Sequence, residues 1–136
     1  MDKISLDSGL RSYRLGQGIL RFNPGDPNVY ARFSEGAEKL RQVEKEFTAS
    51  GEALFGALQQ ADRQMKDILG WIFGPGNDFE EMLGGVNLLA VAENGQRVVT
   101  NLFAALEPIL VEGAERCAGA QAEEARKKAQ IRRSRQ

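Results

Sequence analysis

Residues 22–28, with the sequence FNPGDPN, mark the point at which the pattern of the chain changes from strands to helices. Pro24-Gly25 is a typical turn pair, and the carboxylate of Asp26 can cap free N–H groups at the start of a helix. Pro27 suits the first helical position, because the N–H that it lacks would have no helical partner there. The stretch therefore predicts that a helix begins at Pro27.

A helical stripe follows over residues 27–73. Apolar residues recur every seven positions, and others lie three or four positions away on the same face. The members are Phe33, Leu40, Phe47, Leu54, Ala61 and Ile68, with Val29, Val43, Leu58, Met65 and Ile72 beside them. Poor helix formers interrupt the stripe near Ser50 without shifting its register, so the pattern allows either one long helix or two. Gly36 and Gly56 favour the close approach of another helix but equally lower the stability of the helix.

Upstream of the turn, residues 3–7 and 10–22 alternate apolar with polar side chains and are separated by turn signals. This pattern predicts a small antiparallel hairpin or meander of two or three strands within about residues 2–23. A ribbon of that size is marginally stable alone, so we expect it to lie against a helix or a neighbouring subunit.

Glycines bound the next part of the chain. Gly74-Pro75-Gly76 predicts the end of the long stripe, because proline lacks a donor and glycine tolerates the left-handed conformation of a helix cap. Asn77 or Asp78 is expected to cap a short helix that reaches about Leu83. The aromatic residues around this turn are expected to form a packed corner rather than a ligand pocket; they are Trp71, Phe73 and Phe79.

Residues 86–92 predict a further helix, and a last helix is expected to begin near Gln96. Its broad apolar face consists of Val98, Val99, Leu102, Phe103, Leu106, Ile109, Leu110 and Val111. The sequence thus predicts a mainly α (α+β) fold, in which a small N-terminal β-hairpin precedes a bundle of about four helices. Residues 1–115 are expected to form a single domain.

Residues 116–136 are expected to form a charged, mobile helical tail. The last eleven residues carry six basic side chains and no acidic one, which leaves 12 basic against 19 acidic residues in the rest of the chain. An acidic body with a basic tail allows head-to-tail association, an arm for nucleic acid, or a solubilising tail.

The chain contains no histidine and one cysteine, Cys117. Histidine is the commonest general acid–base and transition-metal ligand, and Cys117 has no histidine partner for nucleophilic catalysis or a zinc site. The sequence contains neither a glycine-rich phosphate loop nor an alternating acidic calcium loop. Its acidic pairs, Glu80-Glu81 and Glu123-Glu124, fit solvated helix faces. We therefore expect no enzymatic activity, no catalytic or metal-binding residue and no cofactor.

Composition points to the cytoplasm. Hydrophobic residues make up 42% and charged residues 27% of the chain, close to the averages for globular proteins. No apolar run approaches the roughly 18 residues of a membrane span, and residues 1–5 lack the features of a secretory signal. A single cysteine forms no internal disulfide, which fits a reducing compartment. We expect a cytoplasmic protein without membrane contact.

The order of these parts resembles the small tail assembly chaperones of long-tailed bacteriophages and prophages of Gram-positive bacteria. The similar features begin with the N-terminal strand pair and with residues 22–27, which lead into a long helix. They continue with the segments Ile72–Gly76, Val86–Leu88 and Asn101–Leu106. The resemblance covers about residues 2–115 and does not include the charged tail.

The resemblance implies a protein that binds the hydrophobic helices of the tape measure protein before assembly and helps to recruit tail tube subunits. It also implies self-association, location in the bacterial host cytoplasm and absence from the mature virion. The partner surfaces would be the heptad-like stripe and the apolar face of the last helix. The residues expected to bind partners are Leu54, Leu58, Trp71, Phe73, Leu102, Phe103, Leu106 and Leu110.

Two other classes of function stay open. One is a secreted, self-assembling helical hairpin with a Trp-x-Gly turn, although the turn here, Trp71–Gly74, is one residue longer and N-terminal strands are foreign to those hairpins. The other is a nucleic-acid-binding accessory protein that uses residues 126–136. The six charges there have no aromatic residues between them, so nucleic acid is not the partner that we expect.

Overall fold

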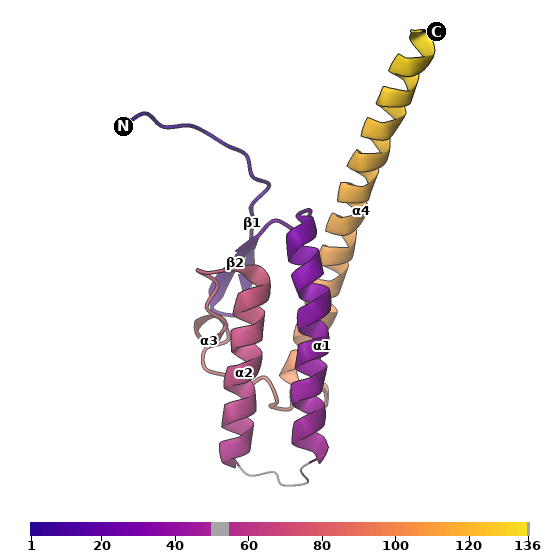
Figure 1. Cartoon of the computed structure of the whole chain (residues 1–136). Coiled ribbons are helices and arrows are strands. Elements are labelled where there is room, and N and C mark those ends of the chain that lie inside the picture. Colours follow the sequence, from indigo (N-terminus) through magenta and orange to yellow (C-terminus); the bar gives the residue numbers. More distant parts are fainter. Residues whose placement is uncertain (50–54, 136) are drawn as a thin grey trace.

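The computed structural model describes residues 1–49 and 55–135 and is mainly helical, with a β-hairpin on its N-terminal side (Figure 1). The hairpin consists of β1 (Arg11–Leu15) and β2 (Gly18–Phe22). The helices are α1 (Pro27–Ala49), α2 (Phe55–Phe73), α3 (Phe79–Met82) and α4 (Val98–Ser134). The predicted fold class, a small hairpin followed by about four helices, is confirmed.

Helix α1 begins at the predicted turn. The Asp26 carboxylate accepts a hydrogen bond of 2.9 Å from the N–H of Asn28, and the Asp26 carbonyl accepts from the N–H groups of Val29 and Tyr30. Pro27 is the first helical residue. The carboxylate and the proline therefore start α1 as their positions in the sequence predict.

Helices α1 and α2 lie side by side and run in opposite directions, which confirms two helices rather than one over residues 27–73 (Figure 1). The predicted break near Ser50 lies outside the described residues. At Gly36 the helices approach so closely that an added Cβ would overlap the side chain of Ile72, as predicted. The same expectation is wrong for Gly56, since within residues 1–49 and 55–135 no other helix comes within 4 Å of an added Cβ there.

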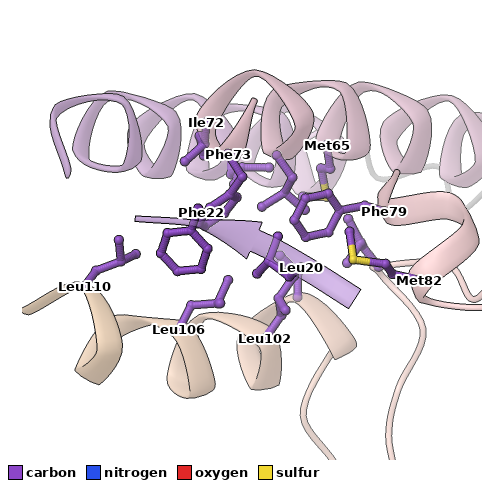
Figure 2. Close-up of a cluster of buried hydrophobic side chains, with 14 of the residues drawn as sticks. Leu20, Phe22, Met65, Ile72, Phe73, Phe79, Met82, Leu102, Leu106 and Leu110 are labelled. Carbon is purple, nitrogen blue, oxygen red and sulfur yellow. The ribbon is translucent and has the colours of Figure 1, made fainter. Parts of the chain in front are cut away.

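The hairpin lies across the core. Leu15 pairs with Gly18 and Arg11 with Phe22 in an antiparallel register, and β2 directs Leu20 and Phe22 between α2 and α4 (Figure 2). The expected contact of the ribbon with helices is confirmed. The expected strand over residues 3–7 is wrong: residues 1–10 form no strand and are exposed, because no neighbouring chain segment pairs with them.

The core is a single apolar cluster. Phe22 contacts Phe73 edge to face, with ring centroids 4.8 Å apart, and Phe73 contacts Phe79 at 5.7 Å. Figure 2 shows these rings between the α2 and α4 side chains. The most deeply buried members are Leu20, Phe22, Leu40, Met65, Leu69, Ile72, Phe79, Leu88 and Leu110. Edge-to-face and tilted aromatic contacts, together with packed leucines, hold the hairpin between the helices.

The corner after α2 forms as predicted, with one exception. Gly74 and Gly76 adopt positive φ angles of 98° and 93°, and the Asp78 carboxylate caps α3 at the N–H of Glu81, 3.3 Å away. Phe73 and Phe79 are buried, but Trp71 is 42% exposed on the surface of α2. Its inclusion in the packed corner is therefore wrong.

The helix expected over residues 86–92 is also wrong, because this stretch is a series of turns. The N–H of Leu88 donates to the Asp62 carboxylate at 2.8 Å, and the Asn87 side chain donates to the carbonyl of Leu58 at 3.2 Å. These bonds to α2 replace the bonds of a local helix. The apolar run packs against the core instead, with Leu88 and Leu89 buried.

Helix α4 has two unlike parts. It begins at Val98, close to the predicted start, and continues without interruption to Ser134. Side chains of its first part are buried as far as Gly113, where the helix backbone touches the carbonyl of Pro24. Residues 114–134, here termed the projecting segment, extend away from the rest of the molecule (Figure 1).

Candidate partner-binding groove

A partly apolar groove runs between α1 and α4. Phe33 of α1 and Phe103 of α4 are half-buried, and their ring centroids lie 5.5 Å apart at a tilt of 54°. Buried Leu40 and Met65 contribute to the lining from below, since they belong to the core. The other lining residues are Ala37, Arg41, Glu44, Val99, Thr100, Ala104 and Glu107.

The composition of the groove suits one kind of ligand. Small side chains at Ala37 and Ala104 leave room beside the two phenylalanine rings, and charged groups at Arg41 and Glu107 border it. Grooves of this type accept the apolar face of an amphipathic helix, while the charged border contacts its polar face. The arrangement therefore favours helix binding over small-molecule chemistry.

Four of the eight expected partner-binding residues are core residues. Phe73, Leu102, Leu106 and Leu110 are no more than 5% exposed, so they form no surface in this chain. Their expected role as a partner surface is wrong for a physical reason. A chain of this size buries only about two-thirds of its unfolded surface, and its own core uses the apolar face of the last helix.

The other four expected residues lie in different places. Phe103 lines the groove, whereas Leu58 packs half-buried on the edge of the core. Trp71 lies on the surface with the Lys39 ammonium 4.4 Å from its ring centroid, a cation–π contact. Leu54 lies outside the described residues. Of the seven expected residues that the structure describes, only Phe103 lines the groove.

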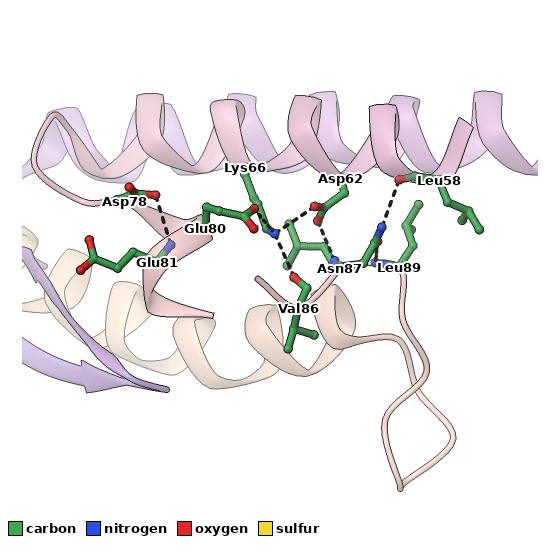
Figure 3. A network of polar contacts seen from close by, with 10 residues as sticks. Leu58, Asp62, Lys66, Asp78, Glu80, Glu81, Val86, Asn87 and Leu89 are labelled. Atoms are coloured by element: carbon green, nitrogen blue, oxygen red, sulfur yellow. Dashed lines mark hydrogen bonds and ion pairs between the residues drawn. The ribbon is translucent and has the colours of Figure 1, made fainter. Parts of the chain in front are cut away.

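A buried ion cluster joins α2 to the segment after it (Figure 3). The Lys66 ammonium donates to the Asp62 carboxylate at 2.9 Å, to Glu80 at 2.6 Å and to the carbonyl of Val86 at 2.9 Å. The other oxygen of Asp62 accepts from the N–H of Leu88. All three ammonium donors thus have partners, which burial of a charge requires.

The cluster is built to keep Lys66 charged. Burial alone lowers the pKa of the Lys66 ammonium, but the hydrogen bonds and charges of Glu80 and Asp62 outweigh burial and raise it above 10.5. A lysine used as a nucleophile or general base needs the opposite shift. Lys66 therefore serves to attach residues 86–88 to α2.

The basic end of α4 has no single binding face. Its six basic residues are distributed around the helix when placed at 3.6 residues per turn. Arg126 and Lys128 also form ion pairs with Glu123 and Glu124, at 2.7 and 3.7 Å. A nucleic-acid arm would present its charges along one side, so the geometry gives that alternative no added support.

Within residues 1–49 and 55–135, no three His, Cys, Asp or Glu side chains gather as a metal site would require. No helix in the same ranges combines the length and the apolarity needed to cross a bilayer.

Comparisons with protein-family models, with curated proteins and with solved structures found no match for this chain. Sequence reasoning found Phe33 and Leu40 only as stripe members and missed Ala37 and Ala104. The available signal was a small residue close to an aromatic one on each helix. Ala37 lies one turn after Phe33 on α1, and Ala104 follows Phe103 on α4.

Proposed function

We propose that this chain is a non-enzymatic tail assembly chaperone of a long-tailed phage or prophage, which binds an amphipathic helix of the tape measure protein in the α1–α4 groove. It acts in the bacterial host cytoplasm, helps to recruit tail tube subunits and leaves before the virion is complete. The observation that carries the proposal is the groove itself, with exposed edges of Phe33 and Phe103 beside two alanines.

Three features support helix binding at this place. The groove lies on two rigid helices, so its shape is largely formed before a partner arrives. Its apolar lining is continuous with the core through Leu40 and Met65, which gives a firm base to an inserted side chain. Its charged border gives orientation, because Arg41 comes from α1 and Glu107 from α4.

The scale of binding follows from the apolar side chains that a partner helix would insert. Each fully buried leucine or phenylalanine contributes about 1.5–3 kcal/mol before the cost of association. Two or three anchors at the spacing of one helix turn then give binding of moderate strength. Moderate affinity suits a chaperone that must later release its partner.

The decisive test compares two neighbouring alanines on α4. Ala104 and Ala105 are both exposed, but only Ala104 lines the groove. Ala104→Glu places a charge where the partner helix would lie and should reduce capture of a co-expressed tape measure protein by about tenfold or more. Ala105→Glu introduces the same charge one position away and should leave capture unchanged. Co-purification followed by titration calorimetry measures both.

Thermal unfolding provides the control, since neither alanine is buried and both variants should melt as the parent chain does. Equal capture by the two variants would refute the groove as the binding site. If the parent chain captures no tape measure helix, the chaperone function itself is refuted.

A further inference from the structure

The hairpin has one closed edge and one open edge. On β2, the N–H of Arg21 donates to the Asn77 side-chain oxygen at 2.9 Å, and the Asn77 amide donates to the Arg21 carbonyl at 2.9 Å. Asn77 therefore occupies the outer edge of β2 as a neighbouring strand would. This contact also fixes the direction in which the Arg21 backbone groups point.

The partner of Arg21 across the hairpin is Ser12. Because Arg21 directs its backbone groups away from β1, the two residues form a non-hydrogen-bonded pair, and Ser12 directs its own N–H and C=O away from β2. Arg14, two residues on, has the same orientation. Within residues 1–49 and 55–135, no hydrogen bond closes this outer edge of β1 at Ser12 or Arg14.

The segment before β1 has the pattern of a strand but no partner. Ile4 and Leu6 alternate with Lys3, Ser5 and Asp7, so one side of an extended segment is apolar and the other polar. Ile4 is 90% and Leu6 83% exposed. Figure 1 shows the segment leaving the hairpin and extending away from the body.

A fixed turn sets the direction of this segment. The Asn23 amide donates to the Ser8 carbonyl at 3.0 Å, and the N–H of Gly9 donates to the Asp7 carboxylate at 2.8 Å. Gly9 has a φ angle of +76°, and a Cβ there would lie 2.6 Å from the Asn23 amide nitrogen. The turn therefore points residues 3–7 away from their own β1 edge.

We propose that residues 3–7 of one copy add as a third strand to the open β1 edge of a second copy. Backbone groups of Ser12 and Arg14 would then gain strand partners. Ile4 and Leu6 would lie on the same side as the half-buried Tyr13 and Leu15 and extend the apolar layer.

Charge favours a second copy of this chain as the occupant. The hairpin is basic, with Arg11, Arg14 and Arg21, and its outward-facing side carries the last two. The polar side of the incoming segment carries Lys3, Ser5 and Asp7. A register that places Asp7 beside Arg14 pairs opposite charges and leaves Lys3, four residues away, beyond the end of β1. Strand exchange needs no tape measure protein, so this inference stands apart from the proposed function.

Each copy has one segment, residues 3–7, that can add to another copy, and one β1 edge that can accept such a segment. Reciprocal exchange between two copies forms a closed dimer, and one-way exchange continues to the next copy. Both assemblies contain the same contact between residues 3–7 and β1. The purified chain should accordingly be an oligomer without any partner present.

Two full-length variants test the two sides of the contact. The arm variant, Ile4→Asp with Leu6→Asp, removes the apolar side of the incoming strand but keeps the β1 edge. The edge variant, Arg14→Pro, removes one outward N–H, which an edge strand tolerates, and keeps the arm. Each variant alone should lose the oligomer. Light scattering after size-exclusion chromatography measures the mass.

Mixing the two variants gives the sharpest result. A dimer should form from one arm variant and one edge variant, because the mixture still contains an intact arm and an intact edge. Matched controls are Lys3→Asp with Ser5→Asp on the polar side of the arm, and Arg14→Ala, which keeps the N–H. Both controls should keep the parent mass.

A monomeric parent chain, or an arm variant with the parent mass, would overturn the proposal. Failure of the mixture to form a dimer would mean that an intact arm and an intact edge do not bind each other between copies, and it would also overturn the proposal. Circular dichroism confirms that each variant is folded. If Arg14→Pro unfolds, Ser12→Pro replaces it at the other outward position, and the arm variant with its control still decides the outcome.

Discussion

The two parts of α4 have the same backbone conformation for different reasons. Residues 98–113 are held by burial, since Val99, Leu102, Leu106 and Leu110 fill the core. The projecting segment, residues 114–134, has no core to enter and consists largely of good helix formers joined by ion pairs such as Glu123–Arg126. Helical structure alone therefore does not identify the part of a helix that stabilises the fold.

The largest expected difference between the two parts concerns apolar side chains. Leu106 is 4% exposed and Ile131 is 52% exposed. Leu106→Ala leaves a cavity among packed neighbours and should lower the free energy of unfolding by about 2–5 kcal/mol. Ile131→Ala should change it by less than about 0.5 kcal/mol. Urea denaturation measures both, and equal effects would mean that the projecting segment is also packed in solution.

Ion pairs should show a similar contrast. Lys66→Met leaves the Asp62 carboxylate buried without its cation and should cost about 2–3 kcal/mol, near the low end for a broken buried pair because Leu88 still donates to Asp62. Lys128→Met removes an exposed pair with Glu124 and should cost less than about 0.5 kcal/mol. Denaturation at neutral pH compares them, and a small effect at Lys66 would contradict the cluster.

The same cluster has a defined pH dependence. The folded state raises the pKa of Lys66 above its ordinary value of 10.5. The stabilisation is therefore fully present below pH 10.5 and is lost as the pH rises through the folded-state pKa. The difference in unfolding free energy between the parent chain and Lys66→Met should stay constant from neutral pH to about pH 10 and shrink above it. A decline that begins at lower pH would mean a lowered pKa.

Sequence patterns predicted the parts whose structure depends on neighbouring residues. The turn at Pro24–Pro27, the hairpin and the glycine-bounded end of α2 follow from local chemistry, and they were confirmed. The helix predicted over residues 86–92 was wrong because the N–H of Leu88 donates to the Asp62 carboxylate and the Asn87 side chain donates to the Leu58 carbonyl, both on α2. Asp62 and Lys66 themselves look like an ordinary surface pair in sequence, four residues apart.

The candidate groove was less predictable than the fold. A periodic stripe identifies apolar faces, but it does not tell which of them the chain buries itself and which it leaves open. Leu102, Leu106 and Leu110 lie on the face of α4 that packs into the core. Phe103, the residue after Leu102, lies on the neighbouring face, which lines the groove. That difference depends on where α1 packs, which is a tertiary property.

Two glycines of α4 should respond to alanine with opposite signs: Gly113 at the boundary between the two parts and Gly119 within the projecting segment. A Cβ at Gly113 would overlap the Pro24 backbone, which has little freedom to move beside the start of α1. Gly113→Ala should therefore lower the free energy of unfolding by about 1–3 kcal/mol through overpacking, despite the better helix propensity of alanine.

Gly119 has nothing within 4 Å, so Gly119→Ala should raise stability by up to about 1 kcal/mol if melting of the projecting segment is coupled to global unfolding. Helix content by circular dichroism, followed beside urea denaturation, separates the two cases: a gain in helix content without a gain in unfolding free energy means that residues 114–134 melt independently. Destabilisation by Gly119→Ala would contradict an exposed helix there, and a stable Gly113→Ala would place the boundary elsewhere.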